Sequence, residues 1–600
     1  MPETEPEFDV VIVGSGIAGA LAAYRLAQAR PQLRVLMIEA GGVAPDSLGR
    51  YALARSYMAS PTKLPDSPFC GDDILAPQPS QAMGKPYYDY DPDPKKSDLF
   101  KSYYERLVGG STWHWQGIFI RMIPNDFRMR SLYGVGFDWP ITYDDLEPWY
   151  VDAEYEMGVA GNDKQVEEFF VPKFNAYRSR PFPMPELVPS YLDAHVSRAV
   201  SAKPFREVSL RVTNVPHAIN SQPYDGRPAC DGHTSCVPLC PIRARYDAVT
   251  HVEKALAAGV ELRTQAIVSR LELDQDGRNV RRVWYRRWSS SGGADAGEQS
   301  VSATIVILAS NAIETPMILF RSSGAANSSG LVGCYLMDHP IKQSFALAPG
   351  PLFPFRGPQT TSDIEGFRDG AFRSEFAAFK VSIKNDGWST VPASGAPRGS
   401  SIPATTAPEE WRPGTLLDLV ANRGYFGTKL RDKIFDHAVR QITLNSACEQ
   451  LPVKENRVTE SDKAANPDLL KLALKLPRIQ YKVDDERHYV RKSFDTIVEL
   501  HKHIFQSMGI DNEMVLQGDT GPDLIYGGSG HIMGTTIMGT NPKESVVDQD
   551  CRSHELGNLY ILGSSVFPTS STANPTSTIA ALALRAAATI GKRLRLGERI

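Results

Sequence analysis

Several features that would assign a protein to a class at once are scarce in this chain. The formal net charge is only −4 and the pI is near 6.3, so no basic surface for nucleic acid or an anionic membrane is expected. No apolar run reaches the roughly 18 residues that span a bilayer, and the acidic start of the chain lacks the apolar core of a signal peptide. Seven cysteines, most of them isolated, exclude a disulfide framework and favour folding in a reducing compartment.

The size and composition are those of an ordinary globular protein. The hydrophobic fraction is 42% and the charged fraction is 22%, both common values. Because 600 residues are too many for one hydrophobic core, we expect two or more folding units. Composition leaves the function open, and short motifs have to decide it.

The first forty residues carry a dinucleotide-binding pattern. An apolar strand at 8–13 leads into a Gly-x-Gly-x-x-Gly turn, a helical stretch, and a second strand that ends at an acid. Gly14 would make the tight turn, Gly16 would let the backbone approach a pyrophosphate, and Gly19 would let helix and strand pack closely. Glu39, the acid, would accept hydrogen bonds from ribose hydroxyls. The pattern predicts a dinucleotide site.

The far end of the chain indicates FAD rather than NAD. A strand is expected over 558–563, followed by a polar loop. Asn574, Pro575 and Thr576 then lead into a helix expected from Thr578 to about Arg593. The N-terminus of that helix would face the flavin ring and stabilise negative charge there.

One short loop, 228–242, contains three cysteines in the spacing C-x5-C-x3-C-P: Cys230, Cys236 and Cys240. The last step matches the end of a bacterial ferredoxin cluster run, and three thiolates indicate a [3Fe–4S] cluster. A [4Fe–4S] cluster, a zinc site completed by His233 or His251, or three thiols without a ligand are the alternatives. A cluster would let a two-electron flavin discharge one electron at a time.

His531 is the candidate catalytic base. It lies in Gly-Ser-Gly-His-Ile-Met-Gly-Thr, a glycine-flanked loop, and a neutral imidazole suits proton removal from an alcohol near neutral pH. The amide of Asn574, at the start of the last helix, would bond the substrate oxygen. The plainer interpretation is a solvent-exposed loop histidine. The other histidines, including His339 in Asp-His-Pro, are interpreted as ordinary.

Together these motifs resemble those of the glucose-methanol-choline oxidoreductases. The resemblance rests on the N-terminal fingerprint and on segments 108–115, 311–316, 530–535 and 574–576. Within the family the chain is most similar to the catalytic large subunits of bacterial FAD-dependent glucose, fructose, sorbitol and gluconate dehydrogenases. The resemblance extends over nearly the whole chain, apart from a segment around 385–435 that looks longer than in the relatives.

The resemblance implies a discontinuous α/β FAD-binding domain of the Rossmann type and an α+β substrate domain built on an antiparallel sheet. The FAD-binding domain is expected at 1–45, 225–335 and 525–600, and the substrate domain at 46–224 and 336–524. FAD is expected to be non-covalent. In the similar pyranose oxidases a histidine of a Ser-Thr-His-Trp motif carries the flavin, but here Trp113 follows Thr112 and displaces His114, which is expected to pack structurally.

The resemblance also implies roles for single residues. His531 and Asn574 would be the catalytic pair, and the three cysteines of loop 228–242 would hold the [3Fe–4S] cluster. The residues expected to contact FAD are Gly14, Gly16, Gly19, Glu39, Gly109, Gly110, Ser111, Thr112, Gly563, Pro575 and Thr576.

The implied function is oxidation of a sugar or polyol hydroxyl, with electrons leaving through the cluster to a cytochrome c subunit. Without its own signal, the chain would be co-exported with a small Tat-exported, chaperone-like subunit to the periplasmic face of the inner membrane; a cytoplasmic location is the alternative. The competing functions are a soluble pyranose-oxidase-like or glucoside 3-dehydrogenase or oxidase enzyme that uses oxygen or a diffusible acceptor, and a flavin-holding scaffold without a substrate. Loop 389–408 is expected to shape access to the site.

Overall fold

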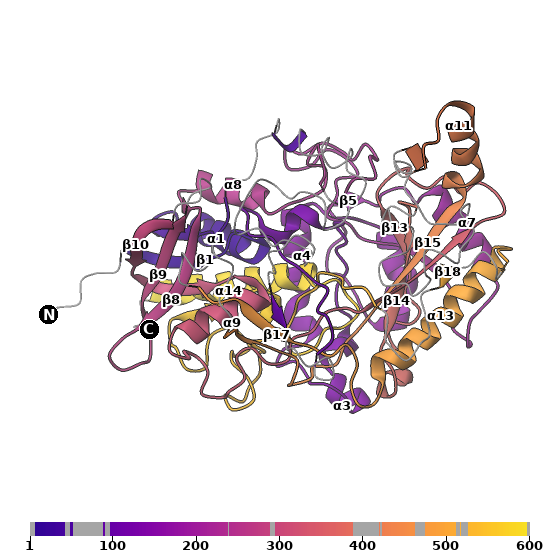
Figure 1. Ribbon diagram of the computed structural model, residues 1–600. Helices are drawn as coiled ribbons and strands as arrows, with labels where there is room; N and C mark the ends of the chain where they lie inside the picture. The colour runs from indigo at the N-terminus through magenta and orange to yellow at the C-terminus, as the bar shows by residue number, and fades with distance from the viewer. Residues whose placement is uncertain are drawn as a thin grey trace.

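The computed structural model describes residues 7–42, 49–51, 88–90, 97–237, 239–288, 294–387, 419–420, 423–462, 474–511, 516–517 and 526–596. The loop expected at 389–408 lies outside these residues. Two sheets dominate the fold and lie in opposite halves of the molecule (Figure 1).

The first sheet has five parallel strands in the order β19-β11-β1-β2-β7. Its strands are β1 (Phe8–Val13), β2 (Val35–Ile38), β7 (Glu261–Arg263), β11 (Ala303–Leu308) and β19 (Leu559–Ile561). The last four residues of β1 and all of β2 are buried and apolar, as expected for strands covered on both faces. The predicted strand, turn, helix and strand at the start of the chain are therefore present.

Helices cover this sheet. Helix α1 (Ile17–Ala29) packs against α14 (Thr576–Leu596) and α8 (Val249–Ala257), and α4 (Tyr143–Met157) packs against α14. The last helix begins at Thr576, two residues earlier than the sequence indicated, because it starts directly after Pro575. Its pairing with α1 brings the two ends of the chain's described part into one layer.

Between β7 and β11 of the parallel sheet, the chain forms a three-stranded antiparallel sheet in the order β10-β9-β8. It comprises β8 (Ala266–Leu273), β9 (Val280–Trp288) and β10 (Ala294–Val301). The central strand, β9, pairs with both of its neighbours.

The second large sheet is antiparallel, with six strands in the order β18-β12-β15-β14-β13-β6. Its strands are β6 (Val212–Asn214), β12 (Ile341–Leu347), β13 (Thr360–Ile364), β14 (Phe379–Lys384), β15 (Gln441–Cys448) and β18 (Leu516–Gln517). Helix α13 (Tyr489–Ser507) lies along its outer side, next to α7 (Tyr191–Val200) (Figure 1). Apolar residues of α13 and of the sheet share one hydrophobic core.

The remaining strands and α-helices lie outside these three sheets. They are β3 (Asp89–Tyr90), β4 (Ala160–Gly161), β5 (Met184–Pro185), β16 (Arg457–Glu460), β17 (Pro477–Gln480), α3 (Met129–Tyr133), α5 (Asp163–Gln165), α6 (Val171–Phe174), α9 (Asn311–Arg321) and α11 (Gly427–Asp436).

The division between the sheets follows the expected segments. Every strand of the parallel sheet comes from 1–45, 225–335 or 525–600, and every strand of the six-stranded sheet comes from 46–224 or 336–524. The broad fold, a Rossmann-like parallel sheet with a separate antiparallel sheet, is as predicted, while the domain boundaries stay predictions.

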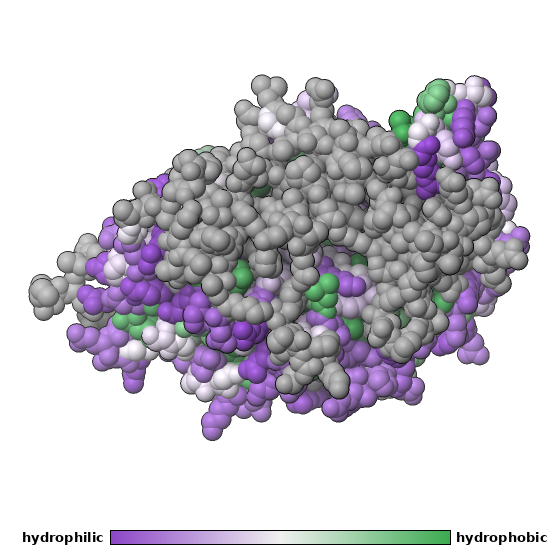
Figure 2. Space-filling model, viewed as in Figure 1, coloured by the Kyte–Doolittle hydropathy of each residue, from purple (hydrophilic) through white to green (hydrophobic). Residues whose placement is uncertain are grey.

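On the face shown in Figure 2, the described side chains are mostly hydrophilic. In the described part of the chain, we find no helix long and apolar enough to cross a bilayer.

Candidate active site

The structure brings His531 and Asn574 together. The amide Nδ2 of Asn574 lies 3.1 Å from Nε2 of His531, although the residues are 43 positions apart. Asn574 is held at the start of α14, and His531 lies in the loop that precedes the β19 region. The carbonyl Oδ1 of Asn574 is buried and has no partner among the described residues. The pair therefore offers one ring nitrogen and one amide to a substrate oxygen.

A second histidine, His339, completes the site, and the sequence alone did not single it out. Its Nδ1 lies 2.8 Å from Nδ1 of His531, and its Nε2 lies 3.2 Å from the backbone carbonyl of Ser570. His339 is 1% exposed, so its ring has no access to bulk water. The Asp-His-Pro context was a signal that could have drawn attention to it.

These contacts assign the position of every proton in the chain of rings. The Ser570 carbonyl can only accept, so Nε2 of His339 carries a proton and the neutral ring has a bare Nδ1. That nitrogen accepts from Nδ1–H of His531, which leaves Nε2 of His531 unprotonated. The basic nitrogen thus faces the Asn574 amide, which donates to it.

Burial keeps both rings neutral. Desolvation lowers the pKa of His531 well below its usual value near 6.5, and the neighbouring His339 and the Lys380 ammonium lower it further. Desolvation also lowers the pKa of His339, to about 4. A neutral imidazole with a bare Nε2 is the form that a general base requires.

Asp338 fixes the backbone around both histidines. Its Oδ1 accepts from the backbone N–H of His339 at 2.8 Å and of His531 at 3.0 Å. Its Oδ2 accepts from the N–H of Ser529 at 3.2 Å and from the hydroxyl of Ser102. Burial outweighs these donors and raises the pKa of Asp338 to about 6. One carboxylate therefore ties two distant loops into a single site.

The glycine turn before α1 has the geometry that a dinucleotide needs. Gly14 has φ +100°, and a Cβ there would lie 2.6 Å from the Ala309 carbonyl. A Cβ on Gly19 would lie 2.0 Å from the Gly14 carbonyl, whereas one on Gly16 would meet nothing within 4 Å. Gly16 precedes α1 without a side-chain cap, so the first N–H groups of the helix stay available to phosphate.

Glu39 closes this turn from the end of β2. Its Oε2 accepts from the N–H and the hydroxyl of Ser15, at 2.9 and 2.6 Å, and its Oε1 accepts from Gly41 N–H at 2.8 Å. Each carboxylate oxygen has two lone pairs, so Oε1 can still accept from a ribose hydroxyl. The expected ribose contact fits this geometry and stays a prediction.

The segment from Gly109 to Thr112 lies against the same turn. Gly109 N–H points at the Ser15 hydroxyl at 3.3 Å, and a Cβ on Gly110 would lie 3.2 Å from the Gly16 Cα. Thr112 donates to the Gly109 carbonyl at 2.6 Å and accepts from Ala248 N–H at 2.9 Å. The segment is thus fixed beside the predicted pyrophosphate position.

The other predicted FAD contacts occupy the ends of two elements. Gly563, with φ +117°, follows β19, and Pro575 and Thr576 start α14. The Ser111 hydroxyl already has a hydrogen-bond partner nearby, since it accepts from Glu105 N–H at 3.1 Å. His114 is largely buried, with Nε2 3.5 Å from Glu105 Oε1. These positions are compatible with non-covalent FAD, which stays a prediction.

The three cysteines lie close together and are all free thiols. Cys236 and Cys240 are each 8% exposed, and Cys236 and Cys230 contact one apolar cluster with Ile219. Burial, together with the neighbouring Cys240 and Cys230, raises the pKa of Cys236 to about 12. In the described ranges, no three histidine, cysteine, aspartate or glutamate side chains are placed to hold one metal ion. The metal site predicted from the spacing is therefore not shown.

Arg245 connects the cysteine loop with the segment beside the glycine turn. It is 1% exposed and donates to the backbone carbonyls of Thr112 and Trp113 at 2.6 and 2.7 Å. Cys240 and Cys236 lie near enough to couple electrostatically with the Arg245 guanidinium, and its Nε has no partner among the described residues. A buried cation therefore lies between the thiols and the predicted flavin site.

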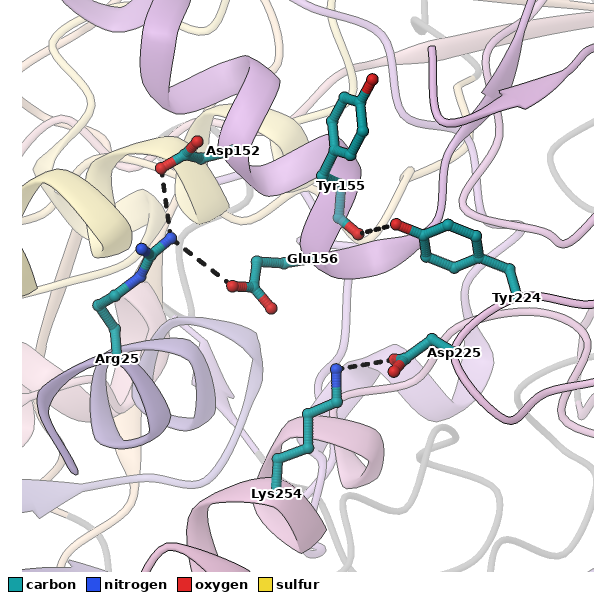
Figure 3. Close-up of a pocket in the computed structure, with 7 residues that line it drawn as sticks. All are labelled: Arg25, Asp152, Tyr155, Glu156, Tyr224, Asp225 and Lys254. Atoms are coloured by element: carbon teal, nitrogen blue, oxygen red, sulfur yellow. Dashed lines mark hydrogen bonds and ion pairs between the residues drawn. The ribbon is translucent and has the colours of Figure 1, made fainter. Parts of the chain in front are cut away.

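A surface pocket of about 440 Å³ lies between α1, α4 and α8 (Figure 3). Its charged groups pair with one another: Arg25 with Asp152 at 3.3 Å and Glu156 at 3.6 Å, and Lys254 with Asp225 at 2.8 Å. The pocket contains none of the predicted catalytic or cofactor-binding residues.

Comparisons with known proteins show which families and proteins the chain resembles. Family models described as GMC oxidoreductase match residues 193–341 and 452–583, and one described as FAD dependent oxidoreductase matches residues 9–147. The chain is 34% identical to the fructose dehydrogenase large subunit of Gluconobacter japonicus, over 98% of each chain. It is 27% identical to the 6'''-hydroxyparomomycin C oxidase of Streptomyces lividus, over 98% of this chain and 92% of that one.

The solved structure of pyridoxine 4-oxidase from Mesorbium loti shares the fold. The TM-score is 0.60 at 18% identity, with 97% of this chain and 99% of that chain covered. At this level of identity the likeness bears on architecture alone.

Proposed function

The chain belongs to the GMC oxidoreductase family of FAD-dependent oxidoreductases, and we propose that it is a dehydrogenase that oxidises a hydroxyl group of a sugar or polyol. The substrate class is supported by the 34% identity to a relative named fructose dehydrogenase large subunit. The reaction type is supported by the chemistry of the histidine and asparagine pair.

One observation carries the proposal: the bare Nε2 of His531 faces the Asn574 amide at 3.1 Å. A hydroxyl placed between them donates its proton to Nε2 and accepts from the amide, which fixes the oxygen as it loses the proton. His339 holds the ring in the required tautomer through the Nδ1 contact at 2.8 Å. Bound FAD supplies the hydride acceptor.

We propose further that Cys230, Cys236 and Cys240 hold a [3Fe–4S] cluster, which would supply one-electron transfer to an external acceptor. In such a cluster each cysteine binds its own iron, so the three sulfur atoms do not have to converge on a single ion. Three free and adjacent thiols fit such a group better than a mononuclear site. The buried guanidinium of Arg245 would offset the negative charge of iron-bound thiolates.

Partner subunits are proposed because one relative is named a large subunit, which implies at least one further subunit in that protein. A cytochrome c subunit would accept the electrons, and a small Tat-exported, chaperone-like subunit would carry the folded chain across the membrane. The working location would then be the periplasmic face of the inner membrane, with membrane association through these partners.

An oxygen-using oxidase is the second candidate. It is favoured by the 27% identity, along nearly all of both chains, to a relative named an oxidase. The two candidates share the catalytic pair and differ in where the electrons go.

The experiment that tests the proposal uses the purified FAD-loaded protein. A panel of sugars, polyols and simple alcohols is added without oxygen, and loss of the flavin absorbance is followed. The reduced protein is then mixed with oxygen or with a one-electron acceptor. We expect a sugar or polyol to bleach the flavin and the one-electron acceptor to restore it faster than oxygen does. Rapid peroxide formation in air would instead establish the oxidase.

A separate measurement tests the cluster. Iron analysis and low-temperature EPR on the oxidised protein should show about three irons and a signal, because an oxidised three-iron cluster has an odd number of electrons. Absence of iron would remove the cluster from the account and leave the flavin chemistry unaffected.

A further inference from the structure

Strand β14 of the six-stranded sheet has an apolar side and a polar side. On β14, Phe379, Val381 and Ile383 belong to the hydrophobic core that contains α13. Because side chains alternate along a strand, Lys380 and Ser382 point to the opposite face. On β14, the side chains turned away from α13 are therefore polar.

A row of polar residues crosses this face from strand to strand. Gln343 on β12 pairs with Asn445 on β15, and Asn445 pairs with Ser382 on β14. Ser382 in turn pairs with Asp363 on β13. Residues directly opposite one another in an antiparallel sheet point to the same side, so the four side chains form a continuous polar row.

The row shares its face with the catalytic histidines. Strand β12 begins at Ile341, and the pairing extends one residue further, where the Pro340 carbonyl accepts from Cys448 N–H at 3.1 Å. By alternation His339, Ile341 and Gln343 lie on one side of this extended segment. His339 contacts His531 from that side. Lys380 lies on the same face, and its ammonium group lowers the pKa of His531.

Part of the face is open. Ile341 and Gln343 on β12, and their partners Asn445 and Ala447 on β15, are partly exposed, while the intervening residues of both strands are buried. The open patch therefore begins next to His339 with two apolar side chains and continues with two amides. The neighbouring Lys380 and Ser382 are 3% and 8% exposed.

Two side chains of this row have an acceptor oxygen without a hydrogen-bond partner among the described residues. The Oδ1 atoms of Asn445 and Asp363 are buried and have no partner among the described residues. The other oxygen of Asp363 binds Lys380 Nζ at 2.5 Å, and Lys380 also donates to the Ser382 hydroxyl at 3.3 Å. Buried polar atoms are almost always hydrogen-bonded, so an acceptor such as Asn445 Oδ1 points to a polar ligand.

We propose that the amides of Gln343 and Asn445 bind hydroxyl groups of the substrate other than the one being oxidised. An amide both donates and accepts, as a hydroxyl does, so two amides match a vicinal pair of hydroxyls. A simple alcohol would leave them unpaired, and the site would discriminate against it. This inference rests on the proposed function and adds the residues that select a polyhydroxylated substrate.

The test replaces each amide by an apolar side chain of similar size, Asn445→Leu and Gln343→Met, in the FAD-loaded full chain. Oxygen-free flavin reduction gives a limiting rate and a half-saturating concentration, with the best polyol and with its deoxy analogues. We expect the half-saturating concentration to rise about 3- to 10-fold, the effect of one neutral hydrogen bond, with the limiting rate nearly unchanged. The rise should disappear for the deoxy analogue that lacks the hydroxyl bound by the replaced amide.

Gln28→Met, on the exposed side of α1, is the matched control and should change neither quantity. If Asn445→Leu does not fold, Asn445→Ser and Gln343→Met still test the inference. Unchanged half-saturating concentrations, or equal rises for every deoxy analogue, would overturn it. The parent protein is measured first: if it reduces its flavin with simple alcohols and with no polyol, the proposed function fails as well, which separates the two failures.

Discussion

His531 and His339 meet through their Nδ1 atoms at 2.8 Å, with ring centroids 4.9 Å apart and ring planes inclined by 84°. The contact joins two neutral imidazoles, so it can be a hydrogen bond only if one Nδ1 carries a proton and the other does not. The carbonyl of Ser570 decides which one. The reactivity of His531 therefore depends on His339, which touches no substrate atom in the proposed reaction.

Replacing His339 tests this dependence. His339→Leu removes the acceptor for Nδ1–H of His531 and frees the ring to rotate or change tautomer. We expect the limiting rate of flavin reduction to fall about 10- to 100-fold, as when a partner that orients a metal-binding histidine is removed. His339→Gln should retain more activity, because its amide can accept from His531 and donate to Ser570. Equal losses in both variants would indicate a merely structural role.

The pH dependence follows from the depressed pKa values. Since the pKa of His531 lies well below 6.5, the base stays neutral throughout the range from pH 6.5 to 9. The limiting rate of flavin reduction should therefore be flat over that range. If the limiting rate instead falls tenfold per pH unit as the pH is lowered, and the fall begins above pH 6.5, the burial of the base is contradicted.

The low pKa of His339 also makes the stability of the folded protein depend on pH. His339 has a folded pKa of about 4, below the 6.5 of the unfolded chain. Between these values the unfolded chain takes up a proton that the folded chain does not, so this contribution to stability is lost as the pH falls from 6.5 to 4. The thermal unfolding temperature of His339→Gln should decline less steeply over this range than that of the parent. An identical decline would show that His339 does not contribute.

Two glycine substitutions separate folding from cofactor binding. Gly19→Ala places a Cβ 2.0 Å from the Gly14 carbonyl, a backbone atom that cannot move aside, and should lower both stability and FAD affinity. Gly16→Ala meets no atom within 4 Å and should leave the FAD-free protein as stable as the parent. It should still weaken FAD binding, because the pyrophosphate approaches that backbone. FAD titration and thermal unfolding measure both, and unimpaired FAD binding in both variants would remove the turn from the cofactor site.

The cysteine proposal predicts a split between two half-reactions. Cys236→Ser should leave flavin reduction by substrate largely intact, because the thiol does not contact the histidine pair. Reduction of a cytochrome c acceptor and the EPR signal should both be lost. Cys334→Ser, a change of a buried thiol outside the loop, is the control and should retain both. Loss of flavin reduction in a folded Cys236→Ser protein would contradict the electron-relay role.

Local patterns predicted the start of the fold well. The limits of β1 and α1 follow from an apolar run, a glycine turn and a helix-forming stretch, all within thirty residues of one another. His531 and Asn574 were identified because each lies in a distinctive short segment. Their contact, across 43 residues, was implied only by the family resemblance.

Other parts of the site depend on pairing that a single sequence does not contain. His339 is 192 residues from His531, and nothing in Asp-His-Pro specifies the ring that it meets. The row from Gln343 to Asp363 arises from the register of four strands, and a shift of one residue would turn it to the other face. Such relationships are properties of the tertiary structure.

The measurement that tests the central claim most directly is the limiting rate of flavin reduction by a polyol, without oxygen, in His531→Gln and in the parent. If His531 is the base, the rate should fall about 10²- to 10⁴-fold while FAD stays bound. His488→Asn, a change at an exposed histidine in a left-handed conformation that asparagine tolerates, should leave the rate unchanged. A His531→Gln rate within a few-fold of the parent would contradict the account.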